Sequence, residues 1–213
     1  MIEYMAYGIY FERYEDMSWN KYQKFITKLT LQQDCHLKES VCTRKIIYRK
    51  PQQGKGESCL EYEIIMRNGD TRHMHLIGKR KQDGNICKKS VWLLKEDCEK
   101  ILEGDIEWIK KEKNIDLYDF YYYLKEEGYK PQMMTESISQ VFDFPYSHNC
   151  ILVQTSKRLL QAEPEEFFMK KLQGTELIKP GKVHIIYRTE NTFPEGAMQA
   201  MNLVNNPEFR YVS

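Results

Sequence analysis

The sequence predicts one α+β domain, residues 1–213, built on an antiparallel sheet. Segments in which apolar and polar residues alternate are joined by turn dipeptides such as Asn68-Gly69, which indicates hairpins. Segments with helical spacing of apolar residues lie between strand-rich regions, and no repeat or long linker divides the chain. We expect about seven or eight antiparallel strands, which are enough for a closed or strongly curved sheet.

The N-terminal part is predicted to form a strand, a helix and a second strand. Residues 8–14 (GIYFERY) favour a short strand. Apolar residues then recur at helical spacing over residues 19–29, and Ser18 precedes them as a plausible N-cap. Residues 41–49 (VCTRKIIYR) favour a strand, and the polar, glycine-containing stretch 51–58 is predicted to be a loop.

The middle of the chain is predicted to be a three-stranded meander. Alternating segments at 59–67, 72–81 and 86–94 are joined by Asn-Gly and Asp-Gly turns, which are strong hairpin signals. Three helices are expected next, at residues 95–102, 106–113 and 117–124, the last of them ending at Gly128.

A second strand-rich region and two more helices complete the predicted order. Strands are expected at 132–144 and 149–160, with a turn through Pro145 and Ser147 between them. Apolar spacing and the helix-stopping Gly174 predict a helix at 165–172, and the apolar run KVHIIYR predicts a strand at 182–188. A last helix is expected at 194–204 because Pro194 lies near its first turn.

Composition excludes few functions. The 213 residues are enough to bury a core, and 41% hydrophobic residues argue against disorder. Lys plus Arg (32) nearly balance Asp plus Glu (31), so the global charge indicates neither a nucleic acid nor a membrane as partner. The apolar stretches fall far short of the ~20 residues that span a bilayer, and the first residues lack a signal-peptide pattern. We expect a cytoplasmic protein without direct membrane insertion.

A cluster of cations marks the hairpin at residues 72–94. Alternate residues of a strand share a face, so one face of its first strand carries His73, His75, Ile77, Lys79 and Lys81. In the next strand Lys88 and Lys89 lie on opposite faces. Like charges that oppose each other across a hairpin repel unless they are solvated or bridged by an anion. The cluster therefore predicts either a solvated outer face or a phosphate-binding surface.

Six short segments of the sequence occur in an order that can be compared with a known protein family. They are FERYE, TRKIIYR, LIGKRKQDGNICKKSVWLL, PQMMTESISQVF, NCILVQTSKR and KVHIIYRTENTFPEGAMQAM. This succession resembles the vacuolar transporter chaperone (VTC) domain, the polyphosphate-polymerase branch of the triphosphate tunnel metalloenzymes. The likeness extends in order over almost the whole chain.

The resemblance implies an antiparallel, barrel-like sheet of about eight strands that encloses a tunnel, with helices around it. Inward lysines and arginines would hold polyphosphate or a nucleotide triphosphate, and inward carboxylates would hold Mg²⁺ or Mn²⁺. Such an arrangement suits phosphoryl transfer, which depends on positioning and charge neutralisation. Carried over residue by residue, the phosphate-binding set is Arg13, Arg44, Arg67, Lys79, Lys81, Lys88, Lys89 and Arg158.

The carboxylates are less complete than the cations. Glu12 matches the opening pair of the family, and Glu61 and Glu63 share a strand face on which they could form a substitute metal pair or simply face solvent. The acid of the family's "EIK" hairpin falls on Ile77, and that of the closing "EIK" falls on His184. These departures imply a catalytic set that is largely eroded.

Two other features have ordinary explanations. His73 and His75 could bind a metal, but no third ligand is near in sequence, so surface histidines are expected. The aromatic run at residues 118–123 is expected to pack in a core or meet a partner, because it is not basic as a nucleic-acid surface would be.

Three functions follow as alternatives. The first is a VTC-like domain that binds polyphosphate or a nucleotide triphosphate with little or no catalysis. The second is an active, metal-dependent polyphosphate polymerase or triphosphatase that uses Mg²⁺ or Mn²⁺. The third is a non-catalytic scaffold that binds a protein partner, which the sequence does not identify.

Overall fold

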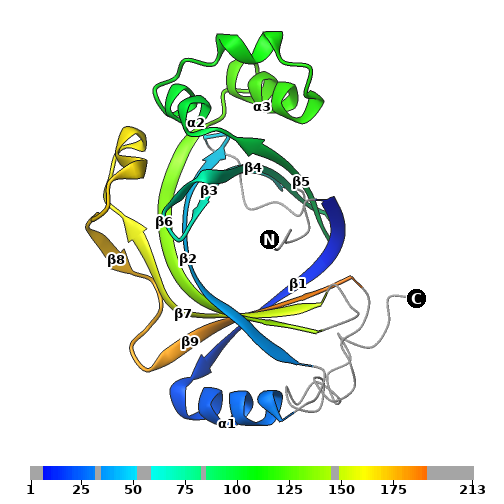
Figure 1. The fold of residues 1–213 in the computed structure, drawn as a ribbon, viewed down its shortest axis with the longest axis vertical. Coiled ribbons are helices and arrows are strands. Elements are labelled where there is room, and N and C mark those ends of the chain that lie inside the picture. Colours follow the sequence, from blue (N-terminus) through cyan, green and yellow to red (C-terminus); the bar gives the residue numbers. More distant parts are fainter. Residues whose placement is uncertain (1–6, 32–34, 52–58, 83–84, 145–148, 191–213) are drawn as a thin grey trace. The chain divides into compact units, whose positions relative to one another are not determined.

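The computed structural model describes residues 7–31, 35–51, 59–82, 85–144 and 149–190, and it has the predicted α+β class with antiparallel strands (Figure 1). Within these ranges there are nine strands and three α-helices. The strands are β1 (Tyr7–Ser18), β2 (His36–Arg49), β3 (Cys59–Arg67), β4 (Asp70–Gln82), β5 (Asn85–Leu93), β6 (Lys130–Asp143), β7 (Cys150–Leu160), β8 (Gly174–Glu176) and β9 (Lys182–Thr189). The α-helices are α1 (Trp19–Thr30), α2 (Lys95–Leu102) and α3 (Ile115–Lys125).

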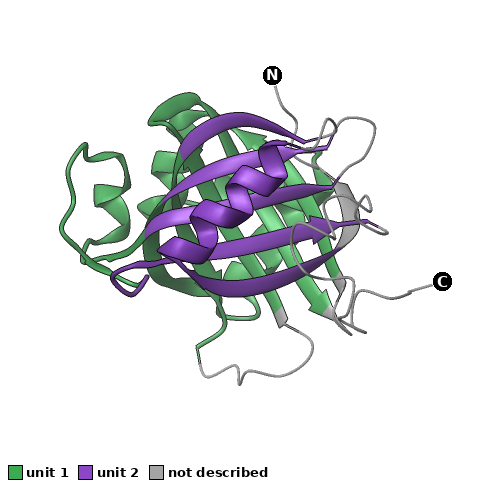
Figure 2. Cartoon of the chain, turned by 90° about the horizontal axis from the view of Figure 1, so that it is seen from below, with its two compact units in different colours: residues 1–9, 42–137, 157–177 green, residues 10–41, 138–156, 178–213 purple. Residues whose placement is uncertain are grey.

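The chain divides into two compact units (Figure 2). Unit 1 comprises residues 1–9, 42–137 and 157–177, and unit 2 comprises residues 10–41, 138–156 and 178–213. Strands β1, β2, β6 and β7 contribute residues to both units. The single domain expected from the sequence remains a prediction.

Unit 1 contains the predicted meander, β3, β4 and β5, with β2 paired beside β3. The register aligns Ile46, Ile64, Leu76 and Val91 across the four strands, and all four are buried. Because successive residues of a strand point to opposite faces, these residues define one apolar face. Helices α2 and α3 lie against β4 on this face, and α3 also contacts β5.

Unit 2 is built around β1, β9 and β7, which pair antiparallel in that order. Helix α1 begins where the hydroxyl of Ser18 accepts a hydrogen bond from the backbone N–H of Lys21, as the predicted N-cap requires. The helix crosses the strands of this unit in Figure 2 and buries Phe25 and Leu29 in the same core as Ile185 of β9.

Two predicted helices are shorter than expected. The segment at 106–113 is a 3₁₀ helix over Glu107–Lys111. The segment at 165–172 is a 3₁₀ helix over Pro164–Phe168, and its last turn gives way to extended backbone at Met169. Phe167 is fully buried there, and the chain then turns to pair the short strand β8 with β7. The sequence pattern predicted no strand at Gly174–Glu176 because three residues are too few to show a period of two.

Several predicted features lie outside the described residues. They are the loop residues 52–58, the turn residues 83–84, the turn at 145–148 and the helix at 194–204. Among the helices that the structure does describe, none is long and apolar enough to span a membrane.

Phe120 on α3 anchors the helix to the sheet, and its truncation should be costly. Its side chain is fully buried between Tyr48 and Tyr62, with ring centroids 5.3 and 5.0 Å away. We expect Phe120→Ala to lower the free energy of unfolding by about 3–5 kcal/mol, because it leaves a cavity in the core. Chemical denaturation measures this change. The matched control is Tyr122→Ala on the same helix, where 46% exposure predicts a change within about 0.5 kcal/mol; equal losses would contradict the packing described.

Candidate functional site

The face of β2–β5 opposite the helices carries charged residues in register, and we call it the charged face. One row across it is formed by Glu61, Lys79 and Lys88, which are cross-strand partners. The next row contains Glu63 and Ile77. The strands supply these residues at alternate positions, between the apolar residues that pack under the helices. The sharing of one face by Ile77 and Lys79, as predicted, follows from this alternation.

Glu61 and Glu63 are buried rather than solvated. Their exposed fractions are 9% and 4%, so the expectation that this pair simply faces solvent is wrong. Arg49 donates from Nε to Glu61 at 2.9 Å, and the Nζ of Lys79 lies 3.7 Å from the same carboxylate. Glu63 is paired with Lys45, with 2.6 Å between Nζ and Oε1. Buried carboxylates need such partners, because a lone charge in this environment would be costly.

Electrostatics on this face favour negative charge. Burial acts to raise the pKa of Glu63, but Lys45, Lys79 and Lys88 outweigh it and lower that pKa to about 2. The pKa of the Lys157 amine is also lowered, which for an amine means that its charged form is disfavoured. Burial lowers its pKa, and the neighbouring Lys45 and Lys79 lower it further, only partly offset by the two glutamates. An anion bound here would relieve the repulsion among the lysines.

Among the described residues, cations outnumber carboxylates around Glu61 and Glu63. The cations are Lys45, Arg49, Lys79 and Lys88 on the charged face and Lys157 on β7, whose amine interacts with both glutamates. Lys79 and Lys88 also stand directly opposite each other in adjacent strands, an arrangement that is destabilising for like charges. An excess of converging cations of this kind is what a phosphate chain requires.

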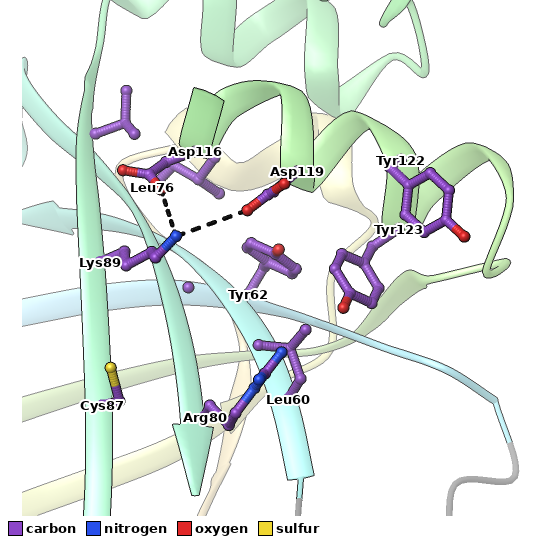
Figure 3. A pocket seen from close by; sticks show the side chains of 12 residues that line it. Leu60, Tyr62, Leu76, Arg80, Cys87, Lys89, Asp116, Asp119, Tyr122 and Tyr123 are labelled. Atoms are coloured by element: carbon purple, nitrogen blue, oxygen red, sulfur yellow. Dashed lines mark ion pairs between the residues drawn. The ribbon is translucent and has the colours of Figure 1, made fainter. Parts of the chain in front are cut away.

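A pocket of about 360 Å³ lies on the other face of the meander, under α3 (Figure 3). Gly78 and Tyr62 form its floor, where a Cβ on Gly78 would come within 3.1 Å of the Tyr62 ring. Lys89 reaches across it to α3, 2.9 Å from Asp116 and 3.7 Å from Asp119. Because these two aspartates balance the pocket's cations, Lys89 and Arg80, the pocket attracts polyanions less than the charged face does.

Two predicted phosphate ligands, Arg44 and Arg158, take part in one cluster around Glu136. Arg44 alternates with Lys45 and therefore lies on the helix-covered face, where it donates to Glu136 at 2.7 Å and to the carbonyl of Phe167 at 2.8 Å. Arg158 pairs with the same glutamate. Arg44 thus links the segment around Phe167 to β2 and, through Glu136, to β6, while Arg158 links β7 to the same glutamate.

The remaining predicted residues lie in three places. Lys81 shares the strand face of Lys79 and is exposed. Arg67 lies near His75, whose pKa it helps to lower. Glu12 and Arg13 belong to unit 2, where Arg188 donates to Glu12 at 2.5 Å.

The described residues fit a metal ion poorly. Nowhere in this part of the chain do three or more His, Cys, Asp or Glu side chains gather as a metal site would require. Mg²⁺ can manage with one or two carboxylates when phosphate oxygens and water complete its shell. On the charged face, however, Arg49 and Lys45 already occupy Glu61 and Glu63. We therefore derive no step through a metal.

Sequence reasoning missed Lys45 and Arg49 on the charged face and Lys157 beside it on β7. The alternation that separates Lys88 from Lys89 also separates Lys45 from Arg44, so this signal was present in the TRKIIYR phrase. Lys157 carried no comparable signal, because it approaches Lys45 only through the tertiary fold.

No protein-family model matches the chain, and no curated protein matches it in sequence. Among solved structures, a candidate adenylate cyclase from Bacillus halodurans is similar, with a TM-score of 0.53 and 13% identity over 98% of this chain and 100% of that one. A candidate adenylyl cyclase from Hippeastrum, described as having a dominant triphosphatase activity, gives a TM-score of 0.47 and 9% identity over 91% and 84% of the two chains. A chain of the Schizosaccharomyces pombe Mediator head module gives 0.47 and 10% over 94% and 93%.

Of these three structures, the Bacillus protein exceeds a TM-score of 0.5, and at 13% identity the likeness concerns the fold alone. It agrees with the predicted α+β fold of antiparallel strands, and it leaves the VTC assignment as a hypothesis.

The lowered pKa of Glu63 predicts a specific acid sensitivity. A carboxylate whose folded pKa lies near 2 stabilises the fold above its ordinary pKa of about 4.5, and this stability is lost as the pH falls through that interval. Glu63→Gln should therefore be less stable than the wild type at pH 7 and should lose less further stability between about pH 5 and pH 2.5. Denaturant midpoints across this range measure the difference. Parallel curves for the two proteins would show that Glu63 is not held ionised by its neighbours.

Glu107→Gln provides the contrast. Glu107 also has a lowered pKa, about 2, through hydrogen bonds from Lys110 and Lys125, but all three side chains are about half exposed. Salt screens exposed charges more than buried ones. High salt should therefore remove the pH effect of Glu107 and leave most of that of Glu63.

Proposed function

We propose that the charged face of unit 1 binds the triphosphate group of a nucleotide triphosphate or of polyphosphate. One observation carries the proposal: among the described residues, four cations of the partly buried charged face and Lys157 of β7 gather around two carboxylates. Surface lysines that served only solubility would spread apart, whereas Lys79 and Lys88 face each other.

The two glutamates have a positioning role in this proposal. Glu61 holds Arg49 and Lys79, and Glu63 holds Lys45, so the carboxylates fix the side chains whose ammonium and guanidinium groups would meet phosphate oxygens. Oriented donors lose less conformational entropy when the ligand binds. The arrangement can bind and orient a phosphate chain, which is the principal protein contribution to phosphoryl transfer.

The fold likeness to a candidate adenylate cyclase and the resemblance to the VTC domain both support a triphosphate ligand. We favour binding with a largely eroded catalytic set over an active polymerase or triphosphatase. The reason is that Ile77, buried and apolar, stands where the resemblance places an acid, and cations occupy the carboxylates that remain.

Tripolyphosphate should stabilise the protein through the charged face. A ligand at 100 times its Kd adds about 2.7 kcal/mol, which raises the melting temperature of a protein of this size by several degrees. We expect this shift in wild type, and we expect it to persist in EDTA because the lysines supply the counter-charge. Lys88→Ala should reduce the affinity, whereas Lys89→Ala should retain it, since these adjacent side chains lie on opposite faces. Differential scanning fluorimetry and calorimetric titration measure both effects.

Three results would speak against the proposal. The absence of any shift at millimolar tripolyphosphate would remove the site, and the scaffold hypothesis would then stand. An equal loss of affinity in Lys88→Ala and Lys89→Ala would place the anion elsewhere. A strict requirement for Mg²⁺ or Mn²⁺, together with turnover of ATP, would favour the metal-dependent enzyme.

Lys157 separates a ligand-binding role from a structural one. Its lowered pKa means that the folded state disfavours its charge, so stability rises as the pH rises through that pKa. Lys157→Met should accordingly melt at the same temperature as wild type or higher in the absence of ligand, while it binds tripolyphosphate more weakly. A variant that is destabilised and binds normally would assign Lys157 to the structure alone.

A further inference from the structure

Trp92 stands out on the charged face as a large aromatic side chain that remains 48% exposed. Its register partner on β4 is His75, and the two ring centroids are 4.0 Å apart with an interplanar angle of 42°. His73 approaches the same indole nearly edge-on, at 5.8 Å and 74°. The indole is thus supported by imidazoles and still offers part of its surface to solvent.

The histidine beneath the indole is fixed and uncharged. Its Nδ1 lies 3.1 Å from the hydroxyl oxygen of Ser90. Burial lowers the pKa of His75 to about 4, and the nearby Arg67 and His73 act in the same direction, so the ring is neutral at pH 7. His73 is held separately by Asp70, at 2.7 Å. Trp92 is therefore supported by histidines that are held in place by hydrogen bonds, and it presents a rigid aromatic surface.

The position of this surface relative to the lysines is set by the strands. His75 and Trp92 pair across β4 and β5, and Lys79 and Lys88 pair four residues further along the same two strands. At about 3.3 Å per residue the two pairs are roughly 13 Å apart on one face. A ribose and a chain of phosphates can bridge such a separation.

We propose that Trp92 is a stacking platform for the base of a nucleoside triphosphate whose phosphates lie on Lys79 and Lys88. The inference rests on the proposed function and narrows its ligand class to a nucleoside triphosphate, in preference to inorganic polyphosphate. Stacking on an aromatic side chain accepts any base, so the platform selects for the presence of a base rather than for its identity.

Calorimetric titration of the full chain with ATP and with tripolyphosphate, both in EDTA, tests the inference. Tripolyphosphate carries no less charge than ATP, so tighter binding of ATP reports the nucleoside. We expect wild type to prefer ATP and Trp92→Ala to weaken ATP binding by about 5- to 150-fold, the effect of losing one stacked base. Its affinity for tripolyphosphate should stay within about twofold. Trp92→Phe should keep most of the preference, because an aromatic face remains.

Trp19→Ala is the control, since Trp19 has a similar exposure, 45%, and lies on α1 in unit 2. It should leave both affinities unchanged. Equal weakening of ATP and tripolyphosphate in Trp92→Ala, or equal binding of the two ligands by wild type, would overturn the platform and leave the proposed phosphate site intact. Failure of wild type to bind either ligand would instead remove the phosphate site itself.

Discussion

The alternation of side chains along the strands of unit 1 determines which residues lie under the helices and which lie on the charged face. The apolar side chains of Ile46, Ile64 and Leu76 are stabilised when they are shielded from water, and α2 and α3 pack over this face and shield them. Their neighbours in sequence are therefore placed on the other face. A lysine and a glutamate such as Lys45 and Glu63 can be held there without disturbing the core, because the core lies on the opposite side of the same backbone.

The charged face is organised by its two acids, around which the described residues gather more cations than carboxylates. A buried glutamate is tolerated only because a partner accompanies it, and Glu63 is 4% exposed with Lys45 beside it. Among the described residues, Lys88 and Lys157 also interact electrostatically with Glu63. Crowded ammonium groups reduce the stability of the free protein, and such a cost is common where a site is prepared for a ligand. Ile77, which is paired with Glu63 in the register, adds an apolar side chain to this face and no carboxylate.

Local pattern was enough to predict much of the fold. The spacing predicted Lys95–Leu102 as a helix with these same ends, and the Asn-Gly turn placed β3 and β4 in a hairpin. It failed for the short strand β8, which exists because β7 offers it partners. The candidate site was less predictable. Alternation placed Lys79 and Ile77 together, but the burial of Glu61 depends on Arg49, twelve residues away on another strand.

The family resemblance and the alternation of side chains gave different information, and the two conflict at Arg44 and Lys89. The resemblance selected both as phosphate ligands by their place in a phrase. The backbone turns them toward the helix-covered side, where Glu136 and Asp116 hold them. A match between short phrases can easily be displaced by one residue. In a strand, a displacement of one residue moves each side chain to the opposite face, so such a match identifies the wrong face.

The local gathering of cations on the charged face of unit 1 would attract small anions to this face in the free protein. In the proposed binding of a phosphate chain, chloride, sulfate or orthophosphate from the medium would leave as the larger anion arrives, so association would be an exchange of ions. The entropy gained by the departing ions contributes to the observed affinity. This gain, and the affinity with it, falls as the salt concentration of the medium rises. The affinity measured for a phosphate chain would therefore depend on the salt in the medium, and orthophosphate buffers would compete with the ligand for the charged face.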